Sequence, residues 1–228
     1  MASLYLLPNL LDPSGSIEEY FPPRVALVVE NLQGLIAESE KEARRYLRRF
    51  VSHEKMQTIS IALLNEHTQE IAPLLAPLKR GESWGLISDA GLCCIADPGS
   101  DLVSLCRQSG IEVQTFAGPS SIFMALQLSG FRAQNFFFHG YLPKEITPLQ
   151  EKIKEMEKEI GTHIWIEAPY RSAKMLQILK DTLGPKKRLC LAASLCSPHQ
   201  RVVCAPIDVW RKNSFVLEKE PVVFLLGE

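Results

Sequence analysis

The sequence has no long hydrophobic run. Its longest apolar stretches, such as "VVFLL" at residues 222–226, have the length of a β-strand, whereas a membrane-spanning helix needs about 20 apolar residues. The first residues, "MASLYLLPNLLDPSG", carry no basic residue ahead of their short apolar run, which argues against a secretory signal peptide. We therefore expect a cytoplasmic protein that has no membrane segment.

An excess of charge of one sign is also lacking. The chain has 25 Lys and Arg against 26 Asp and Glu, a formal net charge of −1, so its overall charge favours neither nucleic acid nor an anionic membrane. Hydrophobic residues make up 46% of its 228 residues, which is typical of a globular protein. This length allows one large domain or two small ones.

Cysteine is scarce and irregularly spaced. Six cysteines without a C-x-x-C pair favour reduced thiols over a disulfide framework. Cys190, Cys196, His199 and Cys204 are one set that offers four zinc ligands. However, "RLCLAASL" around Cys190 alternates like a strand, and structural zinc sites usually have tighter spacings. We expect buried thiols and no metal site.

The common nucleotide and nucleophile motifs are missing. The sequence contains no G-x-x-x-x-G-K-[ST], no G-x-G-x-x-G and no G-x-S-x-G. This excludes a P-loop NTPase, a standard dinucleotide-binding Rossmann domain and a nucleophile elbow.

What the sequence does have is an alternation of strand and helix patterns, which predicts an α/β fold. We expect buried strands at Ser3–Leu7, Arg24–Glu30, Thr58–Leu64, Trp84–Ser88, Ile111–Phe116, Phe136–Tyr141, His163–Ala168, Leu189–Leu195 and Val222–Leu226. The turn near Gly118 is the best candidate for a domain boundary. It predicts an N-terminal lobe of residues 1–117 and a C-terminal lobe of residues 118–228.

Two loops rich in small residues stand at predicted strand ends. They are "SDAGLCCIADPG" at residues 88–99 and "AGPSS" at residues 117–121. Small residues let a ligand approach the backbone, and ligands bind at this edge of open α/β sheets. Together with the loop at residues 8–16, the front loop, they predict a cleft suited to an adenosine-bearing ligand held by main-chain groups.

Four blocks of the sequence resemble the tetrapyrrole methylase superfamily. "LISDAGLCCIADPGSDLVSLCRQSGIEVQTFAGPSS" is similar to the family pattern S-[DE]-A-G-x-P-x-x-[SA]-D-P-G, followed by a helix, a strand and G-P-S. "LIAESEKEARRYL", "FFFHGYLPKE" and "IWIEAPYRS" resemble further family blocks in the same order. The similarity is closest to the branch that contains the small-subunit ribosomal RNA ribose 2′-O-methyltransferases.

The resemblance implies a methyltransferase that uses S-adenosylmethionine (SAM) and acts as a homodimer on ribosomal RNA. It implies two α/β lobes with SAM in the cleft between them. The residues that match the family's cofactor loops are Pro8, Asp89, Ala90, Gly91, Cys94, Ser120, Ser121 and Ala168.

The methyl acceptor stays open, because three segments depart from the family pattern. The front loop reads "LPNLLDPSGS" instead of T-P-I-G-N-L-x-D-I-T, Leu92 and Cys93 replace a Thr-Pro pair, and "AASLCS" replaces R-E-L-T-K. The alternatives are methylation of a tetrapyrrole or other small molecule, and SAM binding without catalysis.

No catalytic base is evident. Glu38 and Glu167 are carboxylates that could accept a proton, and Arg171 could orient an acceptor or a phosphate. Each could instead serve only an ion pair or a helix end.

The segment "KEARRYLRRF" places arginines four residues apart on one helix face. Arg44 lies near Arg48, and Arg45 lies near Arg49. This face could bind RNA phosphates or be an ordinary solvated surface.

Overall fold

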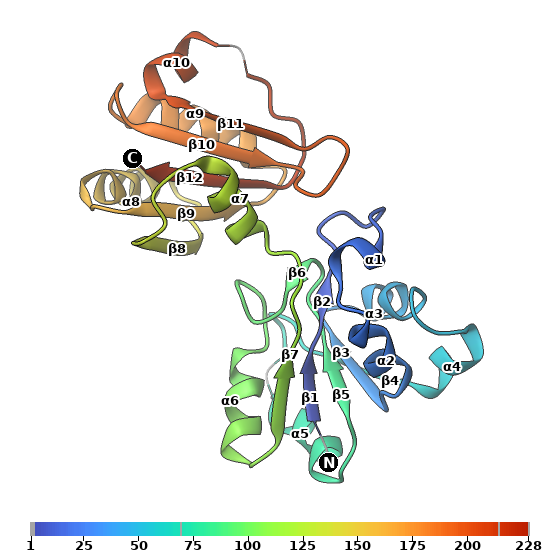
Figure 1. Ribbon diagram of the computed structural model, residues 1–228. Coiled ribbons are helices and arrows are strands. Elements are labelled where there is room, and N and C mark those ends of the chain that lie inside the picture. The colour runs from blue at the N-terminus through green and yellow to red at the C-terminus, as the bar shows by residue number, and fades with distance from the viewer. Residues whose placement is uncertain (1–2, 69, 214, 228) are drawn as a thin grey trace. The chain divides into compact units, whose positions relative to one another are not determined.

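The computed structural model describes residues 3–68, 70–213 and 215–227 (Figure 1). The chain divides into two compact units, Met1–Ser120 and Ser121–Glu228, whereas the turn near Gly118 predicts a division after Ala117. Each unit has a five-stranded sheet of its own.

The sheet of the first unit is entirely parallel, in the strand order β4-β3-β5-β1-β7. Its strands are β1 (Ser3–Leu6), β3 (Gly34–Ala37), β4 (Ser60–Leu63), β5 (Trp84–Leu86) and β7 (Glu112–Thr115). Because all strands run the same way, their carboxyl ends share one edge of the sheet, which we call the carboxyl edge.

Helices cover both faces of this sheet. They are α1 (Ile17–Tyr20), α2 (Arg24–Glu30), α3 (Glu40–Leu47), α4 (His53–Thr58), η1 (Ala72–Leu74), α5 (Leu75–Lys79) and α6 (Ser100–Gln108). One core cluster joins α2, α3 and α4 to Leu35, and another joins α5 and α6 to Ile36. Adjacent strand residues thus face opposite layers, as in a doubly wound sheet.

The prediction of a strand at Arg24–Glu30 is wrong, because this segment forms α2. Val25 and Val29, four residues apart, are buried, whereas Leu27 is 62% exposed. A short apolar run fits a strand or a buried helix equally well, so the packing partner decides between them.

The sheet of the second unit is mixed, in the order β11-β10-β12-β9-β8. Its strands are β8 (Phe136–Tyr141), β9 (Thr162–Glu167), β10 (Arg188–Ala193), β11 (Arg201–Pro206) and β12 (Val222–Gly227). Only the pair β8 and β9 is parallel among the pairings described. The helices are α7 (Ser121–Ser129), α8 (Ile146–Lys158), α9 (Ser172–Thr182) and α10 (Ile207–Lys212).

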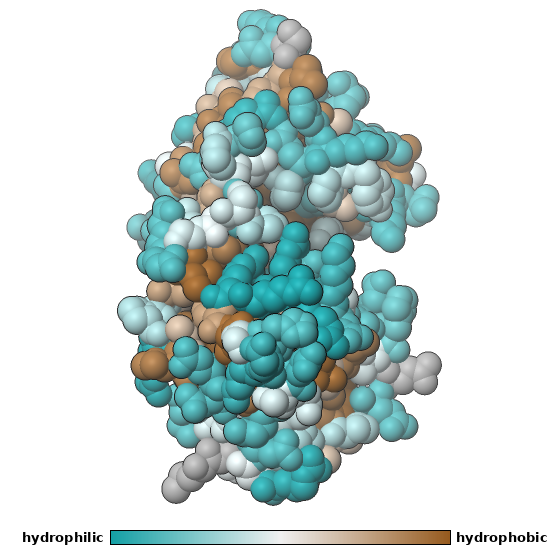
Figure 2. Space-filling model, turned by 90° about the vertical axis from the view of Figure 1, so that its right-hand side faces the viewer, coloured by the Kyte–Doolittle hydropathy of each residue, from teal (hydrophilic) through white to brown (hydrophobic). Residues whose placement is uncertain are grey.

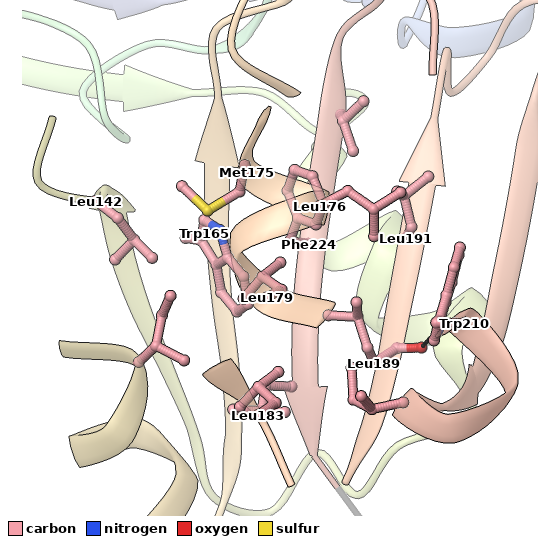
Figure 3. Close-up of a cluster of buried hydrophobic side chains, with 14 of the residues drawn as sticks. Leu142, Trp165, Met175, Leu176, Leu179, Leu183, Leu189, Leu191, Trp210 and Phe224 are labelled. Carbon is pink, nitrogen blue, oxygen red and sulfur yellow. Dashed lines mark hydrogen bonds between the residues drawn. The ribbon is translucent and has the colours of Figure 1, made fainter. Parts of the chain in front are cut away.

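One large hydrophobic cluster holds α8, α9 and α10 against this second sheet (Figure 3). Trp165 of β9 and Phe224 of β12 stack with ring centroids 5.6 Å apart. Trp210 donates a hydrogen bond from its indole nitrogen to the Leu189 carbonyl oxygen at 3.0 Å, so its polar atom is satisfied inside the core.

The expectation of reduced thiols throughout is wrong for one pair of cysteines. Strand β11, which the sequence analysis does not predict, lies antiparallel to β10 and places Cys204 opposite Cys190. The two are joined by a disulfide, with their Cα atoms 4.0 Å apart, while Cys93, Cys94 and Cys106 are free thiols. The disulfide also removes two of the four candidate zinc ligands.

Hydrophilic side chains cover most of the face seen in Figure 2, and hydrophobic ones show on it in small groups. In the described ranges, no helix combines the length and the hydropathy that a membrane crossing requires. The same residues contain no cluster of three or more His, Cys, Asp or Glu side chains able to hold a metal ion.

Candidate functional site

Loops from four strands gather at the carboxyl edge of the first unit. Strand β1 leads into the short strand β2 (Pro8–Asn9), and β5 leads through Asp89 and Ala90 into β6 (Gly91–Leu92). Strands β2 and β6 pair with each other, so the front loop and the loop at residues 88–99 are joined by backbone hydrogen bonds. Glu38 follows β3, and the "AGPSS" loop follows β7.

Gly118 lets the "AGPSS" loop lie directly against the front loop. A Cβ atom at this position would lie 2.2 Å from the Cβ of Pro8 and 3.3 Å from the Cδ2 of Leu92. Gly91 has a φ of +73°, and a Cβ atom added to it would lie 3.5 Å from the Pro119 carbonyl oxygen. The structure therefore brings together the loops that contain Pro8, Gly91 and Ser120.

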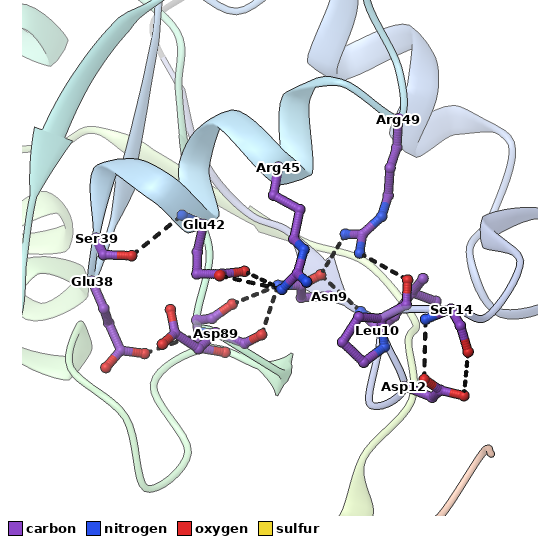
Figure 4. Close-up of polar contacts among 12 residues, drawn as sticks. Asn9, Leu10, Asp12, Ser14, Glu38, Ser39, Glu42, Arg45, Arg49 and Asp89 are labelled. Carbon is purple, nitrogen blue, oxygen red and sulfur yellow. Dashed lines mark hydrogen bonds and ion pairs between the residues drawn. The ribbon is translucent and has the colours of Figure 1, made fainter.

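Asn9 fixes this arrangement and was not singled out from the sequence (Figure 4). Its side-chain amide is buried and donates to the carbonyl oxygens of Ser88, at 2.9 Å, and Asp89, at 3.0 Å. Its Oδ1 accepts from the Leu10 amide at 2.9 Å and from the Arg49 guanidinium at 3.1 Å. The available signal was one amide side chain within the apolar run "LLPNLL", since a buried polar group needs partners.

Three carboxyl groups surround the end of β5. Glu38 accepts a hydrogen bond from the Asp89 backbone N–H at 3.2 Å. Burial raises the pKa of Glu38, and the Asp89 and Glu66 charges raise it further. Burial likewise raises the pKa of Asp89, and burial together with the Glu38 charge raises the pKa of Asp97 to about 6. The ionised forms of these three carboxyl groups are therefore disfavoured unless a cation lies near the end of β5.

The two adjacent cysteines differ in their surroundings: a hydrogen bond with Cys93 lowers the pKa of the partly buried Cys94 thiol, whereas the Cys93 thiol is no nucleophile. Cys93 is buried, and its hydrogen bond with Cys94 together with burial raises the pKa of its thiol, which stays neutral. Cys94 and Ala96 both have a φ of 66°, a left-handed conformation that costs a residue with a Cβ about 1–2 kcal/mol. Such strain is often found at functional sites.

The remaining candidates lie in the second unit. Ser121 is the first residue of α7, and Ala168 directly follows β9. Glu167 accepts from the Ala168 backbone N–H at 2.8 Å and pairs with Arg171 at 3.3 Å. Arg171 also donates to the Pro143 carbonyl oxygen at 3.2 Å. These contacts fix the turn that carries Ala168.

Solved structures define the class of fold. The chain superimposes on a crystal structure of the methyltransferase CobJ with a TM-score of 0.66 and 14% identity, covering 100% of this chain and 95% of that one. For the uroporphyrin-III-C-methyltransferase from Thermus thermophilus, the TM-score is 0.56 and the identity 14%, with coverage of 100% and 94%. The expected α/β fold of the tetrapyrrole methylases is confirmed.

Sequence comparison defines the family. Residues 19–209 match the family of Tetrapyrrole (Corrin/Porphyrin) Methylases. The chain is 31% identical over 205 residues to a protein of Vibrio cholerae named ribosomal RNA small subunit methyltransferase I, covering 90% of this chain and 68% of that protein. A protein of the same name from Synechocystis sp. is 32% identical over 203 residues, covering 88% and 70%. The chain belongs to the tetrapyrrole methylase family and is a SAM-dependent methyltransferase, as the resemblance implies.

Proposed function

We propose that the protein transfers the methyl group of SAM to RNA of the small ribosomal subunit. The observation that carries this proposal is the identity of 31–32%, over about nine tenths of the chain, to proteins named for that reaction. Such a substrate would place the protein in the cytoplasm, as the sequence analysis expects.

The carboxyl edge of the first unit fits the chemistry of SAM. Bound SAM presents a methyl group on a positively charged sulfonium. The close approach of Gly118 to Pro8 leaves backbone where side chains would otherwise stand, and the carboxyl groups of Glu38, Asp89 and Asp97 gain from a nearby cation.

We assign cofactor contacts to the residues that match the family's loops. In the first unit these are Pro8, Asp89, Ala90, Gly91, Cys94 and Ser120. In the second unit they are Ser121 and Ala168. Their role is orientation, which in model reactions is worth roughly 7–11 kcal/mol of barrier.

Of the candidates Glu38, Glu167 and Arg171, Glu38 is the best suited to a catalytic role. When a hydroxyl oxygen attacks the methyl carbon, the bond from carbon to sulfur breaks and the hydroxyl proton must leave. A carboxylate of raised pKa suits that proton near neutral pH. Arg171 is held by Glu167 and Pro143, which favours a positioning role for it.

A homodimer fits the exposed side chains of the second unit. Strand β8 is an edge strand, and the exposed fractions of Phe136, Phe137 and Tyr141 are 37%, 38% and 59%. Phe123 of α7, which is 49% exposed, meets Phe136 edge-on at 5.9 Å. Exposed aromatic groups of this kind are typical of protein interfaces.

The proposal is tested by tritiated methyl incorporation from SAM into small ribosomal subunits purified from a strain that lacks the gene. We expect label in the RNA with native protein and none with heat-denatured protein. Parallel reactions contain a porphyrin-type tetrapyrrole in place of subunits, and label there alone would assign the small-molecule function. Calorimetry with SAM and its demethylated product accompanies them. Heat of binding with no label in any reaction would indicate a binding protein, and no heat at millimolar ligand would contradict SAM use.

A further inference from the structure

Arg49 is bound differently from its neighbours on the arginine-rich segment. Arg44 pairs with Glu40 at 2.6 Å, and Arg45 pairs with Glu42 at 3.0 Å. Arg49 instead reaches the front loop (Figure 4). Its Nη1 donates to the Asn9 Oδ1 at 3.1 Å, and its Nη2 approaches the Pro13 carbonyl oxygen at 3.5 Å.

Both contacts of Arg49 are neutral oxygen atoms. Among the ion pairs of the described residues, none joins Arg49 to a carboxylate. The nearby acids have other partners: Asp12 accepts from the backbone N–H and the hydroxyl of Ser14, at 3.0 and 2.8 Å, and Glu42 pairs with Arg45.

This leaves a half-buried cation without an ion pair of its own. Burial and the nearby Arg45 charge lower the pKa of Arg49, and the Glu42 charge offsets only part of this lowering, so the charged form of Arg49 has lost stabilisation on folding. If Arg49 served only to tie the front loop to α3, a neutral donor would do so without this penalty. An anion that arrives from outside would restore the lost stabilisation, and a guanidinium favours phosphate through paired N–H donors.

We propose that Arg49 binds a phosphate group of the RNA substrate beside the methyl-transfer site. This inference rests on the proposed function. Asn9 bonds to Arg49 and also to the carbonyl oxygen of Asp89 in the proposed SAM loop. A phosphate on Arg49 would therefore stand at a set distance from the methyl donor, and the contact would position the strand to be methylated.

The test measures binding of a small-subunit ribosomal RNA transcript by fluorescence anisotropy at several salt concentrations. For Arg49→Gln we expect RNA binding that is about tenfold weaker. We also expect the slope of log affinity against log salt concentration to decrease in magnitude by about one. SAM affinity, measured by calorimetry, should stay unchanged. Arg80→Gln removes the same charge from the segment ahead of β5, where Arg80 pairs with Glu82, and should leave both affinities unchanged.

The Arg49→Lys variant keeps the positive charge but loses the guanidinium that contacts the front loop, so it separates the two roles. Thermal melting checks that each variant is folded. A lysine that keeps the native salt slope supports the phosphate role. An unchanged slope in Arg49→Gln, an equal loss of slope in Arg49→Lys and Arg49→Gln, or native protein that binds no RNA would overturn it. Weaker SAM binding by Arg49→Gln would also overturn it, by assigning the guanidinium to the SAM carboxylate. RNA binding with the expected slopes but without methyl incorporation would support the inference and contradict the proposed function.

Discussion

Single residues determine how closely the loops at the carboxyl edge approach one another. Asn9 bonds to four groups from three segments, and Gly118 leaves no room for a side chain against Pro8. Both act through the backbone, so their effect on a ligand comes from the shape and rigidity of the loops. The nearby carboxyl groups of Glu38, Asp89 and Asp97 contribute negative charge to the same edge of the sheet.

Replacing Asp97 by Asn is expected to raise the free energy of unfolding and to weaken SAM binding. The pKa of Asp97 is about 6 in the folded protein, against 3.8 ordinarily, so the folded state binds more protons between these values and stability falls as the pH rises through them. At pH 7.5 the variant should gain about 1 kcal/mol of unfolding free energy after allowance for solvent screening. At pH 3 it should gain nothing.

The same variant should bind SAM more weakly, because the proposed SAM site would lose a carboxylate beside the sulfonium cation. Urea unfolding at the two pH values and calorimetry at pH 7.5 check the pair of effects. The exposed Asp181→Asn is the control and should leave both quantities unchanged. An Asp97→Asn protein with native SAM affinity would assign this acid to turn structure.

Replacing Gly118 by Ala is expected to push the "AGPSS" loop away from Pro8. The added Cβ would stand 2.2 Å from the Pro8 Cβ, and such overpacking costs about 1–3 kcal/mol. Thermal melting should show the lost stability, and calorimetry a weaker affinity for SAM. Gly110→Ala has open space and a φ of +71°, so it should lose stability through backbone strain alone and keep its SAM affinity.

At the scale of elements, helix α3 begins at the carboxyl edge and carries the chain to Arg49. Ser39 caps the helix by accepting a hydrogen bond from the Glu42 backbone N–H at 3.2 Å, and Glu40 and Glu42 complement the helix dipole. The helix thereby starts immediately after Glu38 and leaves that carboxyl group at the end of β3.

Ser39→Ala should lower the unfolding free energy by about 1 kcal/mol, because one helix N–H loses its acceptor. Ser39→Asp supplies another good cap and should restore most of the loss. Denaturant unfolding of the three proteins measures the effect, and equal stabilities would show that tertiary packing alone fixes the start of α3.

At the scale of the whole molecule, two sheets with separate cores share one chain, and aromatic groups on β8 and α7 stay exposed. Phe123→Asp should convert the proposed homodimer into monomers, because a charge on an apolar interface loses its water without gaining a partner. Light scattering after size-exclusion chromatography measures the mass. Leu27→Asp, at a residue 62% exposed on α2, is the control and should remain dimeric. A native protein that is already monomeric would contradict the homodimer.

The alternation of strands and helices, the small-residue loops and the family could all be predicted from the amino-acid sequence. These are local signals: apolar periodicity fixes most elements, and the blocks around Asp89 and Ala168 stand in a specific order. They predicted which loops follow strands, and parallel pairing then brought those of the first unit to one edge.

Features that depend on partners distant in the chain became visible only in the folded structure. Arg24–Glu30 became a helix because its valines had a sheet face to cover, and Cys190 met Cys204 because of the register of two strands. The pairing of Asn9 with Arg49 joins residues 40 positions apart. Local pattern carries no information about such contacts, since each is stabilised only after both segments have been placed by packing.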